Sequence, residues 1–213
     1  RSGIETLLAH PNITFVKAEA QFVDAHTVKA DGQEYEAAHI IVATGSVPKT
    51  LRLEQPVSRR VLDSSDLLSL DHLPERLCII GAGVIGMEFA SIFNGFGTEV
   101  TVVEFLKECL PVLDADIAKR LRKTLEKQGV TFHMQSVVTA ITEDGVMFTD
   151  KKGNAVTIAA DEVLMAVGRA PRVFAHFNHA GFEFSERTGI VVNEHLQTTV
   201  PHIYAIVDVN GRS

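Results

Sequence analysis

The sequence predicts an α/β protein in which a parallel sheet with an inserted antiparallel β-meander is accompanied by β-segments from both ends of the chain. Strand-like apolar runs alternate with helical patterns between residues 77 and 134, which is typical of a parallel α/β sheet. Runs rich in Val, Ile, Phe and Thr, separated by Asp-Gly or Gly-Asn turns, occupy 13–43 and 137–159 and indicate antiparallel strands. A strand-like run also lies near the end of the chain, at 203–207.

The N-terminal part is expected to contain the end of a helix and a small meander. Residues 1–10 have a helical pattern, and Asp31-Gly32 separates two strand-like runs as a hairpin turn does. The expected strands lie at 13–23, 26–30, 33–37 and 40–43. Gly45 and Pro48 end the last of these strands, which is apolar enough to be buried.

Residues 49–68 are predicted to connect this part to the next. Pro56 and the later Pro74 disfavour long regular elements in this stretch. One short helix is expected to begin near Ser64-Ser65-Asp66, where the serine side chains can cap it.

The elements of the parallel sheet then follow one another at regular spacing. Expected strands at 77–80, 99–103, 130–134 and 162–168 alternate with expected helices at 84–96 and 114–128. Gly129 follows the second helix, as glycine commonly does beyond a helix C-terminus. The inserted meander is expected at 137–141, 145–149 and 155–159, and a short strand at 189–192.

Composition excludes several classes of protein. The 213 residues are 46% hydrophobic and carry a net charge of −7, so the chain can bury a core and offers no basic surface for nucleic acid or an anionic membrane. No apolar run approaches the length of about 20 residues that spans a bilayer, and the N-terminal stretch has no secretory signal. We therefore expect a cytoplasmic protein. Because the sequence begins at Arg1, we also expect it to begin inside a longer chain or after processing.

The reactive side chains form no recognisable catalytic or metal-binding cluster. Cys78 lies in an apolar run and Cys109 in an expected loop, so neither a disulfide nor a metal site is predicted. The nine histidines lack metal-binding spacing. Neither Tyr35 nor Tyr204 is followed by lysine four residues later, which argues against a short-chain dehydrogenase site, and no G-x-S-x-G elbow is present.

One motif carries chemistry. Gly81, Gly83 and Gly86 form G-x-G-x-x-G directly after a strand and at the start of a helix, and in this context the motif is the dinucleotide-binding fingerprint of the Rossmann fold. The first glycine permits the tight turn, the second lets the backbone approach the pyrophosphate, and the third lets helix and strand pack closely. The helix N-terminus then offers unpaired N–H groups to the phosphates.

Two acidic residues bear on which dinucleotide is bound. Glu104 ends the next strand, at the distance where a carboxylate accepts hydrogen bonds from the adenine ribose and repels a 2′-phosphate, so NAD is predicted rather than NADP. The alternative for Glu104 is an ordinary exposed acid at a strand end. Glu88 has two interpretations: a contact with the ligand, or a side chain that complements the helix dipole in the first turn.

Three stretches carry a family resemblance. They are HIIVATGSVPK before the fingerprint, LMAVGRAPR after it, and GIVVNEHLQTTVPHIYAIVDVNGR near the end of the chain. In this order they resemble the pyridine nucleotide–disulfide oxidoreductases, and within that family they most resemble the dihydrolipoamide dehydrogenases. The resemblance covers essentially the whole chain. It implies that residues 1–48 and 197–213 are parts of an FAD-binding domain, that 49–68 is a connection and that 69–196 is an NAD-binding domain.

The resemblance also implies roles for individual residues. NAD would be held by Gly81, Ala82, Gly83, Val84, Ile85, Gly86, Met87, Glu88, Glu104, Val138 and Gly168. Within this set, Glu88 and Gly168 would lie at the nicotinamide end and Val138 at the adenine side. FAD would meet Ala20, Thr44, Gly45, Ser46 and Asp208.

Several parts of the family pattern are missing from the sequence. It contains no redox-active C-x-x-x-x-C, no second glycine fingerprint for FAD and no C-terminal His and Glu pair. It also carries Val207 where the family has glycine before the aspartate. The chain alone is therefore expected to hold no catalytic residue, to oxidise no dihydrolipoamide and to retain no FAD.

The predicted function is that of the NAD(H)-binding part of a flavin-dependent disulfide oxidoreductase, which positions nicotinamide for hydride transfer to or from FAD. Two alternatives stay open: a stand-alone NAD-binding sensor without catalysis, and a part of a related flavoenzyme such as an NADH oxidase or a mercuric reductase. The resemblance implies a parent enzyme that is a homodimer through a C-terminal domain and a candidate member of a 2-oxoacid dehydrogenase complex. Small-molecule cofactors are the expected partners, and no nucleic acid, membrane or metal is expected.

Overall fold

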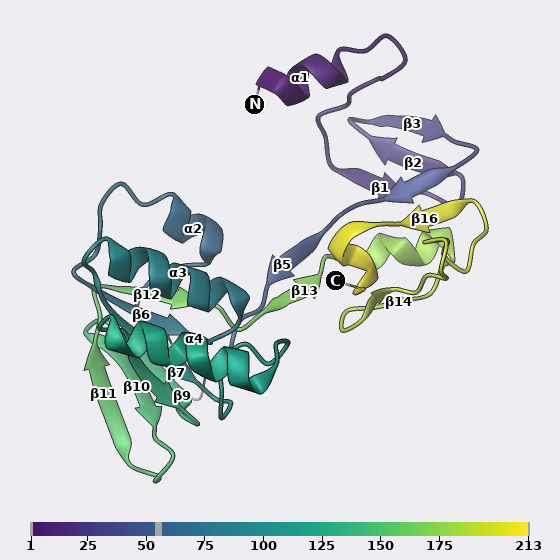
Figure 1. Ribbon diagram of the computed structural model, residues 1–213. Helices are drawn as coiled ribbons and strands as arrows, with labels where there is room; N and C mark the ends of the chain where they lie inside the picture. The colour runs from purple at the N-terminus through teal and green to yellow at the C-terminus, as the bar shows by residue number, and fades with distance from the viewer. Residues whose placement is uncertain (1, 54–56, 213) are drawn as a thin grey trace. The chain divides into compact units, whose positions relative to one another are not determined.

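Figure 1 shows the computed structural model of the protein, which describes residues 2–53 and 57–212. The chain divides into two compact units. The terminal unit comprises Arg1–Val47 and Ala170–Ser213, and the central unit comprises Pro48–Arg169. No helix among the described residues is long and apolar enough to cross a membrane.

A four-stranded parallel sheet forms the middle layer of the central unit. Its strands are β6 (Arg76–Ile80), β7 (Glu99–Glu104), β8 (Thr131–Met134) and β12 (Glu162–Met165), in the order β12-β6-β7-β8 with all neighbours parallel. The predicted parallel α/β sheet is thus confirmed. β12 ends earlier than expected, because the chain turns at Gly168, whose φ is +101°.

The two faces of this sheet bury different cores. Leu77 and Ile79 of β6 belong to a cluster that includes residues of the helices, whereas Cys78 and Ile80 belong to a cluster with the antiparallel strands. Successive strand residues point to opposite faces. Both faces of β6 are buried, so all four of these residues are apolar. This explains why the strand appears in the sequence as a continuous apolar run.

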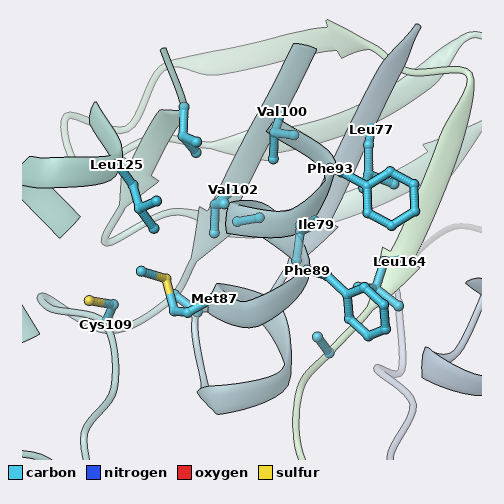
Figure 2. Packing of buried hydrophobic residues seen from close by; sticks show 14 of the residues in the cluster. Leu77, Ile79, Met87, Phe89, Phe93, Val100, Val102, Cys109, Leu125 and Leu164 are labelled. Atoms are coloured by element: carbon cyan, nitrogen blue, oxygen red, sulfur yellow. The ribbon is translucent and has the colours of Figure 1, made fainter. Parts of the chain in front are cut away.

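Helices cover one face of the sheet. They are α2 (Ser64–Leu68), α3 (Val84–Gly95) and α4 (Ala115–Lys127). Figure 2 shows Phe89 and Phe93 of α3 packed in one cluster with strand residues such as Leu77 and Leu164. The helical spacing of these apolar side chains places them on the buried side of α3.

A three-stranded antiparallel sheet covers the other face. Its strands are β9 (Val137–Thr142), β10 (Gly145–Thr149) and β11 (Ala155–Ala159), in the order β11-β10-β9. Ile141, Val146 and Phe148 of these strands are fully buried against the parallel sheet. The inserted meander is therefore confirmed, with strand ends within one residue of those expected.

The short helix α2 is capped by a residue other than the two serines expected to do so. The carboxylate of Asp63 accepts hydrogen bonds from the N–H groups of Ser65 (2.7 Å) and Asp66 (2.9 Å). The Asp66 carboxylate in turn accepts from the N–H of Asp63, which completes a capping box. Ser64 and Ser65 already lie inside the helix, where a side chain is too late to serve as the N-cap.

The terminal unit contains the small meander expected near the N-terminus. β1 (Ala20–Phe22), β2 (Thr27–Ala30) and β3 (Gln33–Glu36) form an antiparallel sheet in the order β1-β2-β3. Asp31 and Gly32 have φ values of 50° and 76°, which is the backbone of a two-residue hairpin turn. The hairpin predicted at this position is confirmed.

The first strand is shorter than the sequence pattern indicated. After α1 (Ser2–Leu8), residues 13–19 form no strand, and Ile13 and Phe15 are 46% and 61% exposed. An extended run becomes a strand only when a neighbouring chain satisfies its backbone groups. Among the described residues, no strand pairs with this run.

The remaining elements of the terminal unit come from both ends of the chain. β4 (Ile40–Val42) pairs in parallel with β16 (Ile203–Ala205), and β14 (Phe184–Ser185) pairs with β15 (Gly189–Ile190). The two short 3-10 helices are η1 (Ala175–Ala180) and η2 (Val207–Asn210), so the strand expected at 203–207 ends before Val207. β5 (Ser46–Pro48) and β13 (Arg169–Pro171), which were not predicted, pair with each other where the chain passes from one unit to the other.

One boundary between the units differs from the sequence-based expectation. Residues 170–196, expected to belong with the central part, lie in the terminal unit. Their Phe177 and Ile190 share a core with Phe22, Val42 and Ile203. The rings of Phe22 and Phe177 meet edge to face, with centroids 6.0 Å apart, and burial of these apolar side chains fixes the segment there.

Candidate functional site

A cavity of about 610 Å³ lies at the carboxyl edge of the parallel sheet in the central unit. Its walls come from the segments that follow β6, β7, β8 and β12, and from the connection after β5. Ligands of open α/β sheets bind at this edge. The lining residues are Leu51, Arg52, Leu53, Ile80, Gly81, Gly83, Val84, Ile85, Val103, Glu104, Phe105, Leu106, Pro111, Ser136, Val137, Val138, Ala166, Val167 and Gly168.

A more voluminous cleft, of about 840 Å³, lies near the amino ends of β6 and β12. Its three arginines are already engaged with the protein. Arg59 donates to the carbonyl oxygen of Ala160 at 2.7 Å, and Arg76 pairs with Asp161 at 2.5 Å. These contacts tie β6, β12 and the preceding loop together, so we assign the cleft a structural role and regard the smaller cavity as the candidate site.

Two glycines of the fingerprint are required by the fold itself. Gly81 has a φ of +105°, and a Cβ there would lie 2.5 Å from the carbonyl oxygen of Ala166. A Cβ on Gly86 would overlap the carbonyl oxygen of Gly81 and lie 3.3 Å from the Ile79 side chain. Only glycine allows this strand, turn and helix to approach so closely.

The middle glycine of the fingerprint, Gly83, is explained by the ligand and not by the packing of the protein. A Cβ on Gly83 would meet no protein atom within 4 Å, and the residue lines the cavity. Gly83 is also the N-cap of α3, and no side chain caps this helix. The start of α3 therefore combines an open backbone with uncapped N–H groups, the two features that a pyrophosphate uses.

Glu104 is held in place at the cavity by the backbone on either side of it. One carboxylate oxygen accepts from the N–H of Ala82 at 2.6 Å, and the other accepts from the N–H of Leu106 at 2.7 Å. The side chain thereby braces the glycine turn against the end of β7. An ionised carboxylate can accept about four hydrogen bonds, so Glu104 keeps acceptor capacity for a ligand hydroxyl.

Most residues predicted to hold NAD line this cavity, and a few do not. Those that line it are Gly81, Gly83, Val84, Ile85, Glu104, Val138 and Gly168. Ala82, Gly86 and Met87 are buried within the packing of α3 against the sheet. Glu88 is exposed and is not among the lining residues. It lies in the second turn of α3, which begins at Val84, and not in the first turn as expected.

The sequence did not predict the rest of the cavity wall. Leu51, Arg52 and Leu53 belong to the connection, which has no periodic pattern to mark it. Phe105 and Leu106 directly follow Glu104, and that position after a strand end was the only signal that could have identified them. Both are exposed, at 70% and 42%.

The loop between β7 and α4 is fixed to both the glycine turn and the helix. The N–H of Leu110 donates to the carbonyl oxygen of Ala82 at 2.9 Å. Arg122 of α4 donates to both carboxylate oxygens of Glu108, at 2.6 Å and 3.0 Å. The Arg122 guanidinium lowers the pKa of Glu108 to about 2, and this carboxylate raises the pKa of Arg122.

The two cysteines take no part in the site. Both cysteines are buried, and neither forms a disulfide. Burial raises the pKa of Cys78 to about 12, and burial together with the Glu108 charge raises the pKa of Cys109 to about 11. A thiol must ionise to act as a nucleophile, so neither cysteine is prepared for catalysis. The described part of the chain also contains no group of three or more side chains placed to bind a metal.

The residues predicted to meet FAD lie in the terminal unit. Ala20 and Thr44 line a cavity of about 260 Å³ together with Glu19, Gln21, Arg172, Phe174 and His176. The Thr44 hydroxyl donates to the carbonyl oxygen of Arg172 at 2.8 Å, and the Ser46 hydroxyl donates to the Asp208 carboxylate at 2.5 Å. Gly45 between them has a φ of +73°. The structure thus brings Ala20 and Thr44 to one cavity and joins Ser46 to Asp208.

Val207, directly before Asp208, has an unfavourable backbone conformation. Its φ is +57° and its side chain is 55% exposed. A β-branched residue in the left-handed region is strained, and an exposed side chain gains little packing to offset the strain. Glycine, which the family resemblance expects here, would have no such penalty.

Val207→Gly is therefore expected to stabilise the terminal unit. Relief of about 1–2 kcal/mol of left-handed strain outweighs the extra chain entropy of glycine, about 0.5–1 kcal/mol. The measurement is urea unfolding followed by circular dichroism. Val191→Gly is the matched control, because Val191 is similarly exposed and has no positive φ. Equal destabilisation by the two substitutions would contradict the strain at Val207.

Comparison with known proteins places the chain in a family of redox enzymes. A family model described as pyridine nucleotide-disulphide oxidoreductase matches residues 1–213. The mitochondrial dihydrolipoyl dehydrogenase of Pisum sativum is 37% identical, with 97% of this chain and 44% of that protein covered. The leghemoglobin reductase of Glycine max is also 37% identical, with 97% and 42% covered.

A solved structure is similar over the whole chain. The HOCl-induced flavoprotein disulfide reductase RclA from Escherichia coli matches with a TM-score of 0.87 and 34% identity, covering 100% of this chain and 49% of that one. The chain thus spans slightly less than half the length of these relatives.

Proposed function

Because the chain belongs to the pyridine nucleotide–disulphide oxidoreductase family, as its three motifs predicted, we propose that the central unit binds NAD(H) for a flavin-dependent disulfide oxidoreductase of the dihydrolipoyl dehydrogenase kind. The unit orients the nicotinamide for hydride transfer to or from FAD in the complete enzyme. Its own contribution is binding and orientation, since the hydride chemistry belongs to the cofactors.

One observation carries this proposal: an open glycine and a fixed carboxylate line the same cavity. Gly83 leaves space at the start of α3 that no protein atom fills, and Glu104 is held by two backbone N–H groups. The first feature fits a pyrophosphate, and the second fits the hydroxyls of a ribose. The residues present therefore fit a dinucleotide.

Each part of the wall has a task in this proposal. The uncapped N–H groups at the start of α3 bind the pyrophosphate. Glu104 accepts hydrogen bonds from the adenine ribose, and Val138 contacts the adenine side. Gly168, at the edge of the cavity after β12, has no Cβ and a φ of +101°, so the backbone there can approach the nicotinamide closely. Glu88 is exposed and does not line the cavity, so its contact with the nicotinamide stays a prediction.

The terminal unit is proposed to contribute to the flavin site of the complete enzyme. Ala20 and Thr44 line one cavity, and Ser46 and Asp208 are hydrogen-bonded to each other. A second candidate function is that of a different flavin-dependent reductase, which the similarity to leghemoglobin reductase and RclA favours. Homodimer formation and membership of a 2-oxoacid dehydrogenase complex are further parts of the first proposal.

The chain is expected to bind NADH more tightly than NADPH. A 2′-phosphate at the adenine ribose would face the Glu104 carboxylate, which offers only acceptor oxygens. Glu104→Ala is expected to weaken NADH binding by about 1.5–3 kcal/mol, the usual range for a hydrogen bond to a charged group. Calorimetric titration of both nucleotides measures the preference and its loss.

Glu104→Gln is the control for the bracing role of this side chain. Glutamine keeps an acceptor for the N–H of Ala82 or Leu106 but has no negative charge, so NADPH should bind it better than the unmodified chain. Unfolding curves of both variants separate a loosened glycine turn from a lost ribose contact. Tighter binding of NADPH than NADH by the unmodified chain would rule out the role assigned to Glu104.

A further inference from the structure

Two histidines of η1 hold the backbone of a single residue in β1. Among the strands that the structure describes, β1 pairs with β2 on one side and with none on the other. The N–H of Phe22 donates to Nδ1 of His176 at 3.2 Å, and the carbonyl oxygen of Phe22 lies 3.0 Å from Nδ1 of His179. Two side chains from the later part of the chain thus take the place of a neighbouring strand at Phe22.

Aromatic packing fixes the orientation of the His176 ring. It stacks on Phe174 with centroids 5.2 Å apart, and it meets Phe177 edge to face at 5.1 Å. The Phe22 ring lies 6.2 Å from it. With the ring held by three aromatic neighbours, its Nδ1 cannot turn away from Phe22 without disturbing this packing.

The two imidazoles must carry their protons on different atoms. A backbone N–H can only donate, so Nδ1 of His176 is unprotonated. A carbonyl oxygen can only accept, so Nδ1 of His179 carries a proton. His202 makes a third contact of this kind, because its Nε2 lies 2.8 Å from the carbonyl oxygen of Ala25 and must donate to it.

Protonation affects these contacts unequally. A donating imidazole still donates after it gains a second proton, so the contacts of His179 and His202 survive. Nδ1 of His176 would change from an acceptor into a donor and would then face the N–H of Phe22. Of the three contacts, only the one made by His176 is reversed by acid.

We propose that His176 is a positioning residue that holds the N–H of Phe22 against η1 only while its imidazole is neutral, so that mild acid loosens β1 at this residue. Ala20 of β1 and His176 itself line the 260 Å³ cavity of the terminal unit. Loosening of the strand therefore alters one wall of this cavity. The effect on flavin binding rests on the role proposed above for Ala20, whereas the loosening of the strand does not.

The surroundings of His176 favour its neutral form. Burial lowers its pKa, the nearby His179 lowers it further, and Glu19 acts in the opposite direction. Arg172 lines the same cavity and is also cationic. In the unfolded chain the ordinary pKa is about 6.5, so the folded form binds fewer protons. The contribution to stability is complete above about pH 6.5 and is lost as the pH falls towards the lowered pKa.

The first test is the protonation state of each ring in the full chain at about pH 8. Long-range nitrogen–proton spectra of histidine distinguish the two neutral tautomers. We expect His176 with its proton on Nε2 and His179 with its proton on Nδ1. A proton on Nδ1 of His176 would overturn the proposal, and because this measurement uses the unmodified chain, no variant needs to fold for the result to be decisive.

The second test is hydrogen exchange at the Phe22 amide, corrected for intrinsic exchange at each pH. Protection should fall by about tenfold between about pH 7.5 and about pH 5, as for loss of one hydrogen bond. His176→Asn keeps an acceptor at the δ position that does not titrate, so it should retain protection at the lower pH. His176→Phe should lack protection at both, and His195→Asn, at an exposed site, should behave like the unmodified chain.

Two results of the exchange experiment would contradict the proposal. One is the same acid-induced loss of protection in His176→Asn as in the unmodified chain. The other is full protection of Phe22 in His176→Phe. If the ring had only a structural role, its replacement would lower the protection of the Phe22 amide equally at both pH values, and asparagine would not restore that protection.

Discussion

Alanine in place of Gly86 should destabilise the central unit severely, whereas alanine in place of Gly83 should leave it folded but poor at binding NADH. A Cβ on Gly86 would overlap the carbonyl oxygen of Gly81, and neither the strand end nor the helix can move freely. Overpacking of this kind costs about 3 kcal/mol, a large part of the stability of a typical domain. A Cβ on Gly83 would enter empty space instead.

The loss of binding in Gly83→Ala has a steric cause. The new methyl group would point into the cavity at the start of α3, where it holds the pyrophosphate away from the helix N–H groups. We expect NADH affinity to fall by at least about tenfold, as for the loss of one or more charge-assisted hydrogen bonds. The free energy of unfolding should change by less than about 1 kcal/mol, the usual effect of exchanging glycine and alanine at an N-cap.

Urea unfolding followed by circular dichroism, together with calorimetric titration of NADH, distinguishes the two glycines. The pair of variants serves as its own control, because both add one methyl group to the same motif. Unchanged NADH binding by a folded Gly83→Ala would rule out the pyrophosphate site at the start of α3. Similar stabilities of the two variants would show that the packing at Gly86 is less tight than the structure indicates.

Replacement of Arg122 by methionine is expected to cost the central unit about 2 kcal/mol and to change its response to acid. Arg122 makes two hydrogen bonds with Glu108 and a further one with Glu126, and its side chain is only 17% exposed. Removal of one partner leaves a partly buried carboxylate without compensation, which is the costly way to break such a pair.

The acid response follows from the lowered pKa of Glu108. This pKa is about 2 in the folded chain and about 4.3 in an unfolded one, so the folded form binds fewer protons. The pair therefore contributes stability above about pH 4.3 and loses it as the pH falls towards 2. In Arg122→Met that contribution is absent, so stability should fall less steeply over this range.

Arg120→Met provides the matched control for this prediction. Arg120 lies on the same helix, is exposed, and has no ion pair among those found in the described residues. Its replacement should change the free energy of unfolding by less than about 0.5 kcal/mol, as is usual on a surface. An unchanged acid response in Arg122→Met would mean that another residue determines the stability of this loop at low pH.

The sequence predicted the central sheet well because its signals are local. β6 is apolar on both faces, and a Cβ on Gly81 or Gly86, which follow it, would meet backbone atoms. Glu104 was predictable for the same reason, since it ends the next strand. The cavity residues Leu51 and Leu53 were not predictable, because an aperiodic connection gives no sign of which side chains turn inward.

The errors arose where tertiary contacts decide. Residues 170–196, expected in the NAD-binding domain, lie in the terminal unit, and nothing local shows that Phe177 packs against Phe22. Asp63 and not the two serines caps α2, because the Asp63 carboxylate accepts from the N–H of Asp66 and the Asp66 carboxylate accepts from the N–H of Asp63. The left-handed backbone of Leu110 and Val207 is likewise imposed by the fold, since neither residue favours it.

The terminal unit is built from two separate segments of the chain, and this has a consequence for the kinetics of folding. Its parallel pair joins β4 from the early part of the chain to β16 from the late part, and the whole central unit lies between them in sequence. Closure of so long a loop carries an entropic cost that slows formation of the pair. The central unit is one continuous segment and can fold without that closure. Once it has folded, the flexible chain between β4 and β16 is shorter, so their pairing costs less entropy. The two units are therefore expected to form in sequence, with the central unit first.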